Sequence, residues 1–252
     1  MVWISRDARK NEDLLVIENK RFPEQRISLL DLIDDTYLTR QFFKDLTLLG
    51  AINKVLVEID YPIFGKRISD FHYYQAFKTS WFGCYKSFAN AEDYWQFAWE
   101  TAWLKMGDCE DTSILLASYL EMHKYNYYIC FGEVYHQNTL LGGHAWIVVE
   151  ISPPEGNWRL VETTLDEPIP NLNVLPQVDI LFNDWYVDEI RYHAYIMINK
   201  RVIREYEPTG LINLKCYMKV RKKYKKNERK KIQRIREVWS RWIEKKYNSL
   251  YY

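Results

Sequence analysis

The first clear hydrophobic pattern in the chain is helical. Between residues 27 and 49, apolar residues recur at mixed spacings of three and four, and the run stops at Gly50. This spacing predicts one or two amphipathic helices that end at that glycine. Residues 52–64 favour neither helix nor strand, because Pro62 interrupts the pattern. Residues 70–103 are dense in aromatic side chains, which we interpret as core, since no stacking platform for nucleic acid is needed to explain them.

A second helix, followed by strands, is predicted further along the chain. Residues 109–122 have the spacing of an amphipathic helix, and Asp108 can cap its start. Three strand-like runs follow, at 126–135, 144–151 and 157–165. The last two flank Ser-Pro-Pro-Glu-Gly, whose composition is typical of a hairpin loop. A helix followed by consecutive strands favours the α+β class with an antiparallel sheet.

The pattern after the third strand-like run divides the chain into parts. Residues 166–176 contain three prolines and are predicted to be loop, whereas short strand-like pieces recur around residues 185–206. Residues 208–210 then break the pattern before a basic tail. We expect three parts: an N-terminal, mainly helical region (1–69), a core (70–210) and a helical C-terminal tail (211–252).

Charge is distributed unevenly along the chain. The net charge is only +1, but residues 215–252 hold 15 Lys and Arg against three acids, or +12, which leaves −11 for residues 1–214. Within the tail, apolar residues recur at helical spacing: Ile232, Ile235, Val238, Trp239, Trp242 and Ile243. We favour a helix whose apolar stripe docks on the acidic body. The alternative is a contact with nucleic acid or an anionic membrane.

Cysteine usage and the chain's first residues restrict the class of protein. The four cysteines show no Cys-x-x-Cys spacing, which argues against a zinc ribbon or a disulfide framework. We see no signal-peptide pattern and no apolar run long enough to span a bilayer, so we expect a cytoplasmic protein with reduced cysteines.

One cysteine differs from the other three in its surroundings. Cys109 is predicted to begin a helix, where unpaired N–H groups and the helix dipole favour the nucleophilic thiolate. A nucleophilic sulfur also needs a base and a group that orients the base. His144, directly after two glycines that allow close approach, opens a predicted strand and can be that base. By contrast, Cys130 and Cys84 fit the ordinary interpretation of a small buried hydrophobe.

Hairpin register tests which acid could orient His144. If residues 152–156 form the loop, paired residue numbers sum to 308 and His144 faces Thr164. Glu162 then lies on the same face as His144, on the diagonal, within reach of a long side chain. A four-residue loop would put Glu162 on the opposite face. Asp166 shares the parity of Glu162, so spacing alone leaves both acids open.

Three blocks stand in order along the chain: Gly107-Asp108-Cys109-Glu110-Asp111, Gly143-His144-Ala145-Trp146, and the segment from Trp158 to Thr164. Together they resemble the transglutaminase-like superfamily, and the segment with Tyr94-Trp95-Gln96 and Glu100-Thr101 resembles the part before the nucleophile in prokaryotic and viral members. The resemblance covers roughly residues 70–185. It implies a papain-like α+β core in which the nucleophile helix packs on an antiparallel sheet.

The resemblance also implies a role for each residue of the site. Cys109 would be the nucleophile, His144 the general base and acid, and Glu162 the orienting carboxylate, at a position where the family usually has Asp. For the oxyanion, the N–H of Cys109 is one expected donor. A second donor could be the amide of Gln96 or the indole N–H of Trp81 or Trp95. Asp111 and Asp166 complete the set of supporting residues.

The remaining histidines are interpreted as structural. His72 and His193 lie among aromatic residues, His123 is at a predicted helix end, and His136 follows a strand. Metal binding by His136 with His144 and Glu162 has no short ligand spacing to support it, so we expect neither a metal nor a cofactor.

Two functions from different classes follow from the sequence. The first is a cysteine-dependent hydrolase or acyltransferase that acts on a peptide, protein or other amide through a thioester, with a protease or amidase favoured over a cross-linking enzyme. The second is a non-catalytic binding or structural protein on the same fold, whose residues 215–252 contact nucleic acid or an acidic assembly partner.

Overall fold

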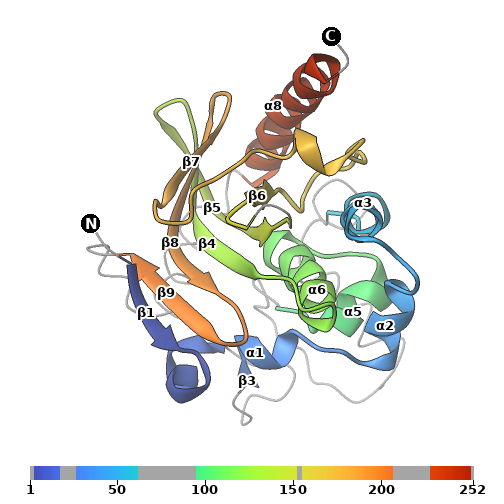
Figure 1. Cartoon of the computed structure of the whole chain (residues 1–252), viewed down its shortest axis with the longest axis vertical. Helices are drawn as coiled ribbons and strands as arrows, with labels where there is room; N and C mark the ends of the chain where they lie inside the picture. The colour runs from blue at the N-terminus through green and yellow to red at the C-terminus, as the bar shows by residue number, and fades with distance from the viewer. Residues whose placement is uncertain (1–2, 18–26, 62–94, 152–154, 207–227, 251–252) are drawn as a thin grey trace.

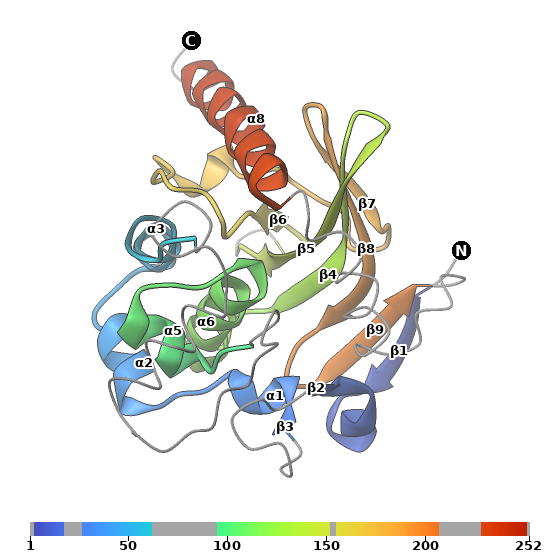
Figure 2. The same ribbon diagram turned by 180° about the vertical axis from the view of Figure 1, so that it is seen from behind.

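The computed structural model describes residues 3–17, 27–61, 95–151, 155–206 and 228–250. Its centre is a seven-stranded antiparallel sheet in the order β1-β9-β8-β4-β5-β6, with β7 paired to β8 (Figures 1 and 2). The strands are β1 (Trp3–Asp7), β4 (Tyr127–His136), β5 (Thr139–Glu150), β6 (Trp158–Val161), β7 (Asp184–Val187), β8 (Ile190–Ile198) and β9 (Val202–Tyr206). A separate pair, β2 (Val16–Ile17) and β3 (Ile27–Ser28), lies near the start of the chain.

Helices gather beside this sheet, as both views show (Figures 1 and 2). They are α1 (Leu29–Leu32), α2 (Tyr37–Phe42), α3 (Leu48–Glu58), α5 (Ala98–Leu104), α6 (Cys109–Met122) and α8 (Glu228–Ser249), with short 3₁₀ turns η1 (Arg9–Leu15) and η2 (Leu172–Val174). The predicted α+β class with an antiparallel sheet is therefore confirmed. The aromatic run from 70 to 94, with His72, Trp81 and Cys84, and the basic residues 215–227 lie outside the described residues.

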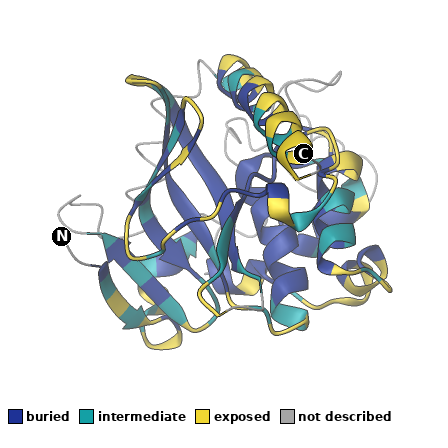
Figure 3. Ribbon diagram, turned by 45° about the horizontal axis from the view of Figure 1, so that its top comes forward, coloured by how far each residue is buried: buried dark blue, intermediate teal, exposed yellow. Residues whose placement is uncertain are grey.

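Helix α6 lies between the sheet and three of the other helices. It packs against β4 and β5 on one side and against α5, α2 and α3 on others. Every residue from Cys109 to Leu120 is buried, as Figure 3 shows by colour. The predicted helix is present, but its predicted amphipathic character is wrong. Its polar residues are accommodated by hydrogen bonds, as where the hydroxyl of Ser118 accepts from the N–H of Asp34 at 3.1 Å.

The predicted helix end at Gly50 is also wrong. Gly50 lies in the first turn of α3, which continues to Glu58. Thr47 caps this helix, and its hydroxyl accepts a hydrogen bond from the N–H of Gly50 at 3.2 Å. A glycine in a first turn costs little when a threonine cap satisfies its N–H, so the cap and the apolar residues beyond it set the helix limits.

The N-terminal and strand predictions are modified in three places. The N-terminal region contains α1, α2 and α3 but also β1, which pairs with β9 at the edge of the main sheet. Strand β5 begins at Thr139 rather than at His144, because the segment before the two glycines pairs with the end of β4. Strand β6 ends at Val161, four residues earlier than expected.

The C-terminal helix α8 docks on the body through its apolar stripe. Ile232, Ile235, Val238 and Trp239 are completely buried, and the helix contacts β5, β7 and η2. Three body acids pair with its basic residues: Arg236 with Asp166 (2.7 Å), Arg241 with Glu189 (3.0 Å) and Lys245 with Asp188 (3.8 Å). The favoured interpretation of the tail, docking on the acidic body, is confirmed for residues 228–250. Among the helices described, none is both long and apolar enough to cross a membrane.

Candidate functional site

The histidine and glutamate predicted from register lie in direct contact. Strands β5 and β6 pair with residue numbers that sum to 308, as in Ile147 with Val161, so the predicted register is confirmed. The first residue after β6 is Glu162, and its two carboxylate oxygens lie 3.0 and 2.9 Å from Nε2 of His144. Both side chains are completely shielded from solvent. A buried acid and imidazole in this geometry form a polar pair inside an apolar core.

Glu162 is held by more groups than His144 alone. Its Oε1 accepts from the N–H (3.0 Å) and hydroxyl (2.6 Å) of Thr164, and its Oε2 accepts from the hydroxyl of Tyr192 (2.7 Å). Burial raises the pKa of Glu162, but the pKa is lowered overall because the charge and hydrogen bond of His144 and the bonds from Thr164 and Tyr192 favour the carboxylate. Burial, followed by the charge of Glu162, raises the pKa of Tyr192 well above its ordinary value.

These contacts determine the protonation pattern of the pair. An ionised carboxylate can only accept hydrogen bonds, so Nε2 of His144 carries the proton that points to Glu162. The phenol of Tyr192 stays neutral and donates. A neutral His144 then has Nδ1 as its basic nitrogen.

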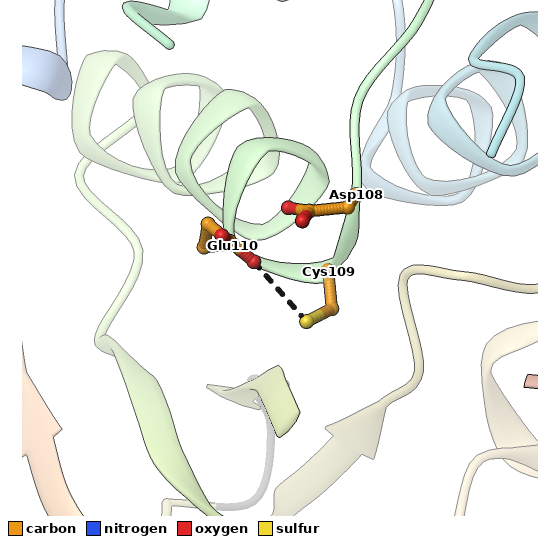
Figure 4. A group of neighbouring side chains, drawn as sticks. All are labelled: Asp108, Cys109 and Glu110. Carbon is orange, nitrogen blue, oxygen red and sulfur yellow. Dashed lines mark hydrogen bonds between the residues drawn. The ribbon is translucent and has the colours of Figure 1, made fainter. Parts of the chain in front are cut away.

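Cys109 is the first residue of α6, and it is fully buried. Asp108, the N-cap residue, precedes it, and Figure 4 shows the side chains of Asp108, Cys109 and Glu110 gathered at the helix start. The Sγ of Cys109 donates a hydrogen bond to Oε2 of Glu110 at 3.2 Å. In this arrangement, Cys109 is a thiol whose proton points to the carboxylate of Glu110.

Hydroxyl contacts join the start of α6 to the segment that carries Glu162. The hydroxyl of Thr163 lies 2.9 Å from that of Thr112 and 3.0 Å from that of Ser113. Thr112 and Ser113 belong to the first turns of α6, and Thr163 directly follows Glu162. Since α6 also packs on β5, the strand of His144, the three predicted catalytic residues come from neighbouring elements of one buried region.

Asp111 has a structural task in this arrangement. Its Oδ2 accepts from the N–H of Asp108 at 3.2 Å, and its Oδ1 accepts from the N–H of Gln96 at 2.9 Å. Asp111 thus fixes the start of α6 to the segment before α5. Close packing requires Gly107 here, because a Cβ at that position would lie 2.7 Å from Cβ of Asp111.

The other two supporting residues are buried in the segment before α5. Oε1 of Gln96 accepts from the hydroxyl of Thr101 at 2.7 Å, which orients the amide group. The ring of Trp95 stacks on Phe131, with centroids 5.5 Å apart.

Asp166, the second acid allowed by parity, lies elsewhere. Its carboxylate is exposed and accepts from Nη1 of Arg236 at 2.7 Å. Of the two acids, Glu162 is the one hydrogen-bonded to His144.

The other histidines that the structure describes, and Cys130, have surroundings of their own. His193 lies 2.9 Å from Asp184, His123 packs on Tyr119 at the end of α6, and His136 approaches Glu189 at 4.0 Å. Burial raises the pKa of the Cys130 thiol well above its ordinary value, as expected for a core cysteine.

Within the described ranges, the ligand atoms of one group lie close enough for a single metal ion, within 4.8 Å of one another: Asp108, Cys109 and Glu110. They are consecutive residues at one helix start, where capping and the thiol–carboxylate bond account for their proximity. His136 is not part of this group.

Sequence reasoning missed the residues that support the pair from outside the hairpin. Tyr192 comes from β8, and its hydroxyl accepts from Nε1 of Trp239 in α8 at 2.8 Å. Lys231, also in α8, donates to the carbonyl oxygen of Gly143 at 2.6 Å. The only sequence signal was a tryptophan in the apolar stripe, since a buried indole N–H requires an acceptor.

Comparison with known proteins gave no match that bears on this site. No family model matches the chain, and searches of curated proteins and of solved structures also found no match.

Proposed function

We propose that this protein is a cysteine-dependent hydrolase or acyltransferase, with a papain-like core of the transglutaminase-like kind and a triad of Cys109, His144 and Glu162. The single observation that carries the proposal is the buried hydrogen-bonded pair of His144 and Glu162. An acid that fixes an imidazole by one nitrogen makes the other nitrogen available for proton transfer.

The proposed reaction begins at the sulfur of Cys109. Nδ1 of His144 removes the thiol proton, and the thiolate attacks the carbonyl carbon of an amide or ester. The tetrahedral intermediate collapses, the imidazolium gives its proton to the departing amine or alcohol, and a thioester remains on Cys109. Water or an amine, deprotonated by His144, then attacks the thioester and restores the thiol.

Glu110 sets a condition on the first step. In the thiol form, the sulfur donates to the carboxylate of Glu110, a contact that favours the protonated state. Transfer of the thiol proton to His144 therefore breaks the contact between Cys109 and Glu110.

Charge on the carbonyl oxygen would be stabilised at the start of α6. The N–H of Cys109 belongs to the first turn of the helix, whose N–H groups lack acceptors within the helix itself. The Gln96 amide, oriented by Thr101, is the proposed second donor. We favour water over an amine as the acyl acceptor, and hence an amidase or protease acting on a peptide or protein.

Alkylation by iodoacetamide tests the proposal. We expect Cys109 to be modified rapidly near neutral pH, with the site identified by mass spectrometry, and His144→Ala to slow this modification at least about tenfold. Cys130 is the internal control, because burial raises the pKa of its thiol and it lies outside the proposed triad. Modification of Cys109 at equal rates in the wild type and in His144→Ala would contradict the triad.

The second candidate function is a non-catalytic protein that binds nucleic acid or an acidic partner through residues 215–252. The +12 charge of that segment favours it. Against it, three basic residues of α8 already pair with acids of the body. Salt-dependent binding of DNA or RNA, lost when residues 215–252 are deleted, together with an unreactive Cys109, would favour this alternative.

A further inference from the structure

Helix α8 reaches the backbone on both sides of the His144–Glu162 pair. Lys231 is completely buried, and its Nζ donates to the carbonyl oxygen of Gly143, the residue before His144. Nε of Arg236 donates to the carbonyl oxygen of Thr164, two residues after Glu162, at 2.8 Å. The same helix thus binds the two chain segments that carry the pair.

A third contact from α8 reaches the carboxylate itself through Tyr192. An indole N–H can only donate, so the hydroxyl of Tyr192 must be the acceptor for Trp239. This directs the proton of that hydroxyl to Oε2 of Glu162. All three side chains are at least 99% buried, so water does not compete for these bonds.

We infer that Trp239 and Tyr192 are positioning residues, and that α8 is a part of the catalytic site rather than an appendage to it. The inference rests on the proposed function, because positioning matters for catalysis only if His144 acts as a base. Four groups donate to Glu162: the hydroxyl of Tyr192, the N–H and the hydroxyl of Thr164, and Nε2 of His144, which lies near both carboxylate oxygens. Since a carboxylate has about four acceptor sites, these bonds leave one orientation of the group.

The physical consequence is that the tail and the pair depend on one another. Without the Trp239 bond, the Tyr192 hydroxyl would be held less firmly and would be a weaker donor to Oε2 of Glu162, which would then depend more on His144. The carboxylate would become easier to protonate and less well aligned with Nε2 of His144. A misplacement of this kind lowers reactivity by about ten- to hundredfold in comparable sites.

Conservative variants separate this role from simple packing. Tyr192→Phe removes one hydroxyl, and Trp239→Phe removes the indole N–H while retaining an aromatic ring. The matched control is Trp242→Phe, because Trp242 lies on the same helix and its Nε1 donates at 2.8 Å to the carbonyl oxygen of Val174, in η2. Circular dichroism identifies variants that have kept the fold. If Trp239→Phe does not fold, Tyr192→Phe decides the question.

The first measurement does not depend on catalysis. The proton on Nε2 of His144 is followed by NMR and assigned by its loss in His144→Gln. We expect it to exchange with water about tenfold faster in Tyr192→Phe and Trp239→Phe, and at the wild-type rate in Trp242→Phe. Unchanged exchange in the two test variants, or equal acceleration in Trp242→Phe, would overturn the inference.

The second measurement connects the bonds to chemistry. In Tyr192→Phe, the pH at which iodoacetamide modification of Cys109 reaches half its maximal rate should rise, because a carboxylate held less firmly against Nε2 stabilises the His144 imidazolium, and with it the Cys109 thiolate, less well. No rise in a variant with accelerated Nε2 proton exchange would also count against the inference. If Cys109 is unreactive in the wild type while proton exchange responds as expected, the proposed function fails and the positioning bonds stand.

Discussion

At the scale of single residues, the glutamate at position 162 is suited to its place in the hairpin. The residue follows the last paired position of β6, so its carboxylate must reach His144 along a diagonal. The additional methylene of Glu, compared with Asp, supplies part of this reach. The longer side chain also meets the hydroxyls of Thr164 and Tyr192, which an acid held closer to the strand would meet less directly.

Glu162→Gln is the sharpest test of that residue. The groups around the Glu162 carboxylate all donate to it. The NH₂ group of a glutamine would therefore either face one of these donors or point to Nε2 of His144. In the latter case Nε2 becomes an acceptor and Nδ1 carries the proton, the wrong tautomer for a base. The corresponding change in Ser-His-Asp proteases lowers kcat about 10⁴-fold. We expect iodoacetamide modification of Cys109 to slow at least about tenfold, and Asp166→Asn to leave it unchanged; the reverse result would move the role to Asp166.

Stability should depend on pH through the same carboxylate. The pKa of Glu162 is lowered from its ordinary value of 4.5 in the folded state, so ionised Glu162 stabilises the fold above about pH 4.5. That contribution is lost as the pH falls through the folded-state pKa. Urea unfolding between pH 6 and pH 3 should therefore show a stability advantage of the wild type over Glu162→Gln that shrinks with falling pH. An advantage that grows with acidity would show that the pKa is raised instead.

Glu110 should restrain the nucleophile. Its carboxylate lies 3.2 Å from Sγ of Cys109, where a negative charge opposes formation of a thiolate. We expect Glu110→Gln to speed iodoacetamide modification of Cys109 at pH 7 by about tenfold, equivalent to roughly 1.4 kcal/mol. Slower modification would mean that Glu110 assists the thiolate, for example by holding the sulfur in its reactive rotamer.

The contact between His144 and Glu162 could be predicted from the sequence because side chains alternate strictly along a hairpin. A five-residue loop fixes parity, and parity fixes the face. Parity could not choose between Glu162 and Asp166, since that choice depends on Arg236, which lies 70 residues beyond Asp166. Tyr192 and Trp239 were missed for the same reason: their partners are distant in sequence, and no local spacing records the contact.

At the scale of elements, the start of α6 depends on close packing as much as on capping. The motif around Cys109 begins with Gly107, where an added Cβ would also lie 3.1 Å from Cγ2 of Thr101. Local pattern predicted the helix and its first residue correctly. It could not predict that the helix would be buried on all sides, because that depends on how α2, α3 and α5 pack around it.

Two glycine substitutions test this packing. Gly107→Ala should destabilise the protein by about 1–3 kcal/mol, because the backbone must shift to relieve the contact with Asp111. Gly50→Ala is the control: its nearest contacts would be an ordinary 3.5 Å, and alanine in a helix should stabilise by up to about 1 kcal/mol. Thermal unfolding of both variants measures the difference. Equal and small effects would show that Gly107 is replaceable.

At the scale of the whole molecule, acids of the body pair with part of the positive charge of the tail. The outer face of α8 contacts Asp166, Asp188 and Glu189, and its buried face is apolar apart from Lys231. Two forces therefore hold the helix, charge pairing and burial. Exposed ion pairs contribute at most about 1 kcal/mol each and weaken with salt, whereas a buried aliphatic side chain contributes several times as much.

Because burial contributes more than exposed ion pairs, we expect the apolar contacts to be what holds α8 on the body. Ile235→Ala, at a completely buried position, should destabilise the protein by about 2–5 kcal/mol, with early hydrogen exchange in α8. Lys245→Ala removes a largely exposed partner of Asp188 and should cost less than about 0.5 kcal/mol. If Lys245→Ala destabilised the protein more than Ile235→Ala, and added salt also destabilised it, charge pairing would be the force that docks the tail. Because α8 also supports Glu162 through Trp239, loosening by Ile235→Ala should accelerate exchange of the His144 proton as well, which links the stability of the tail to the state of the site.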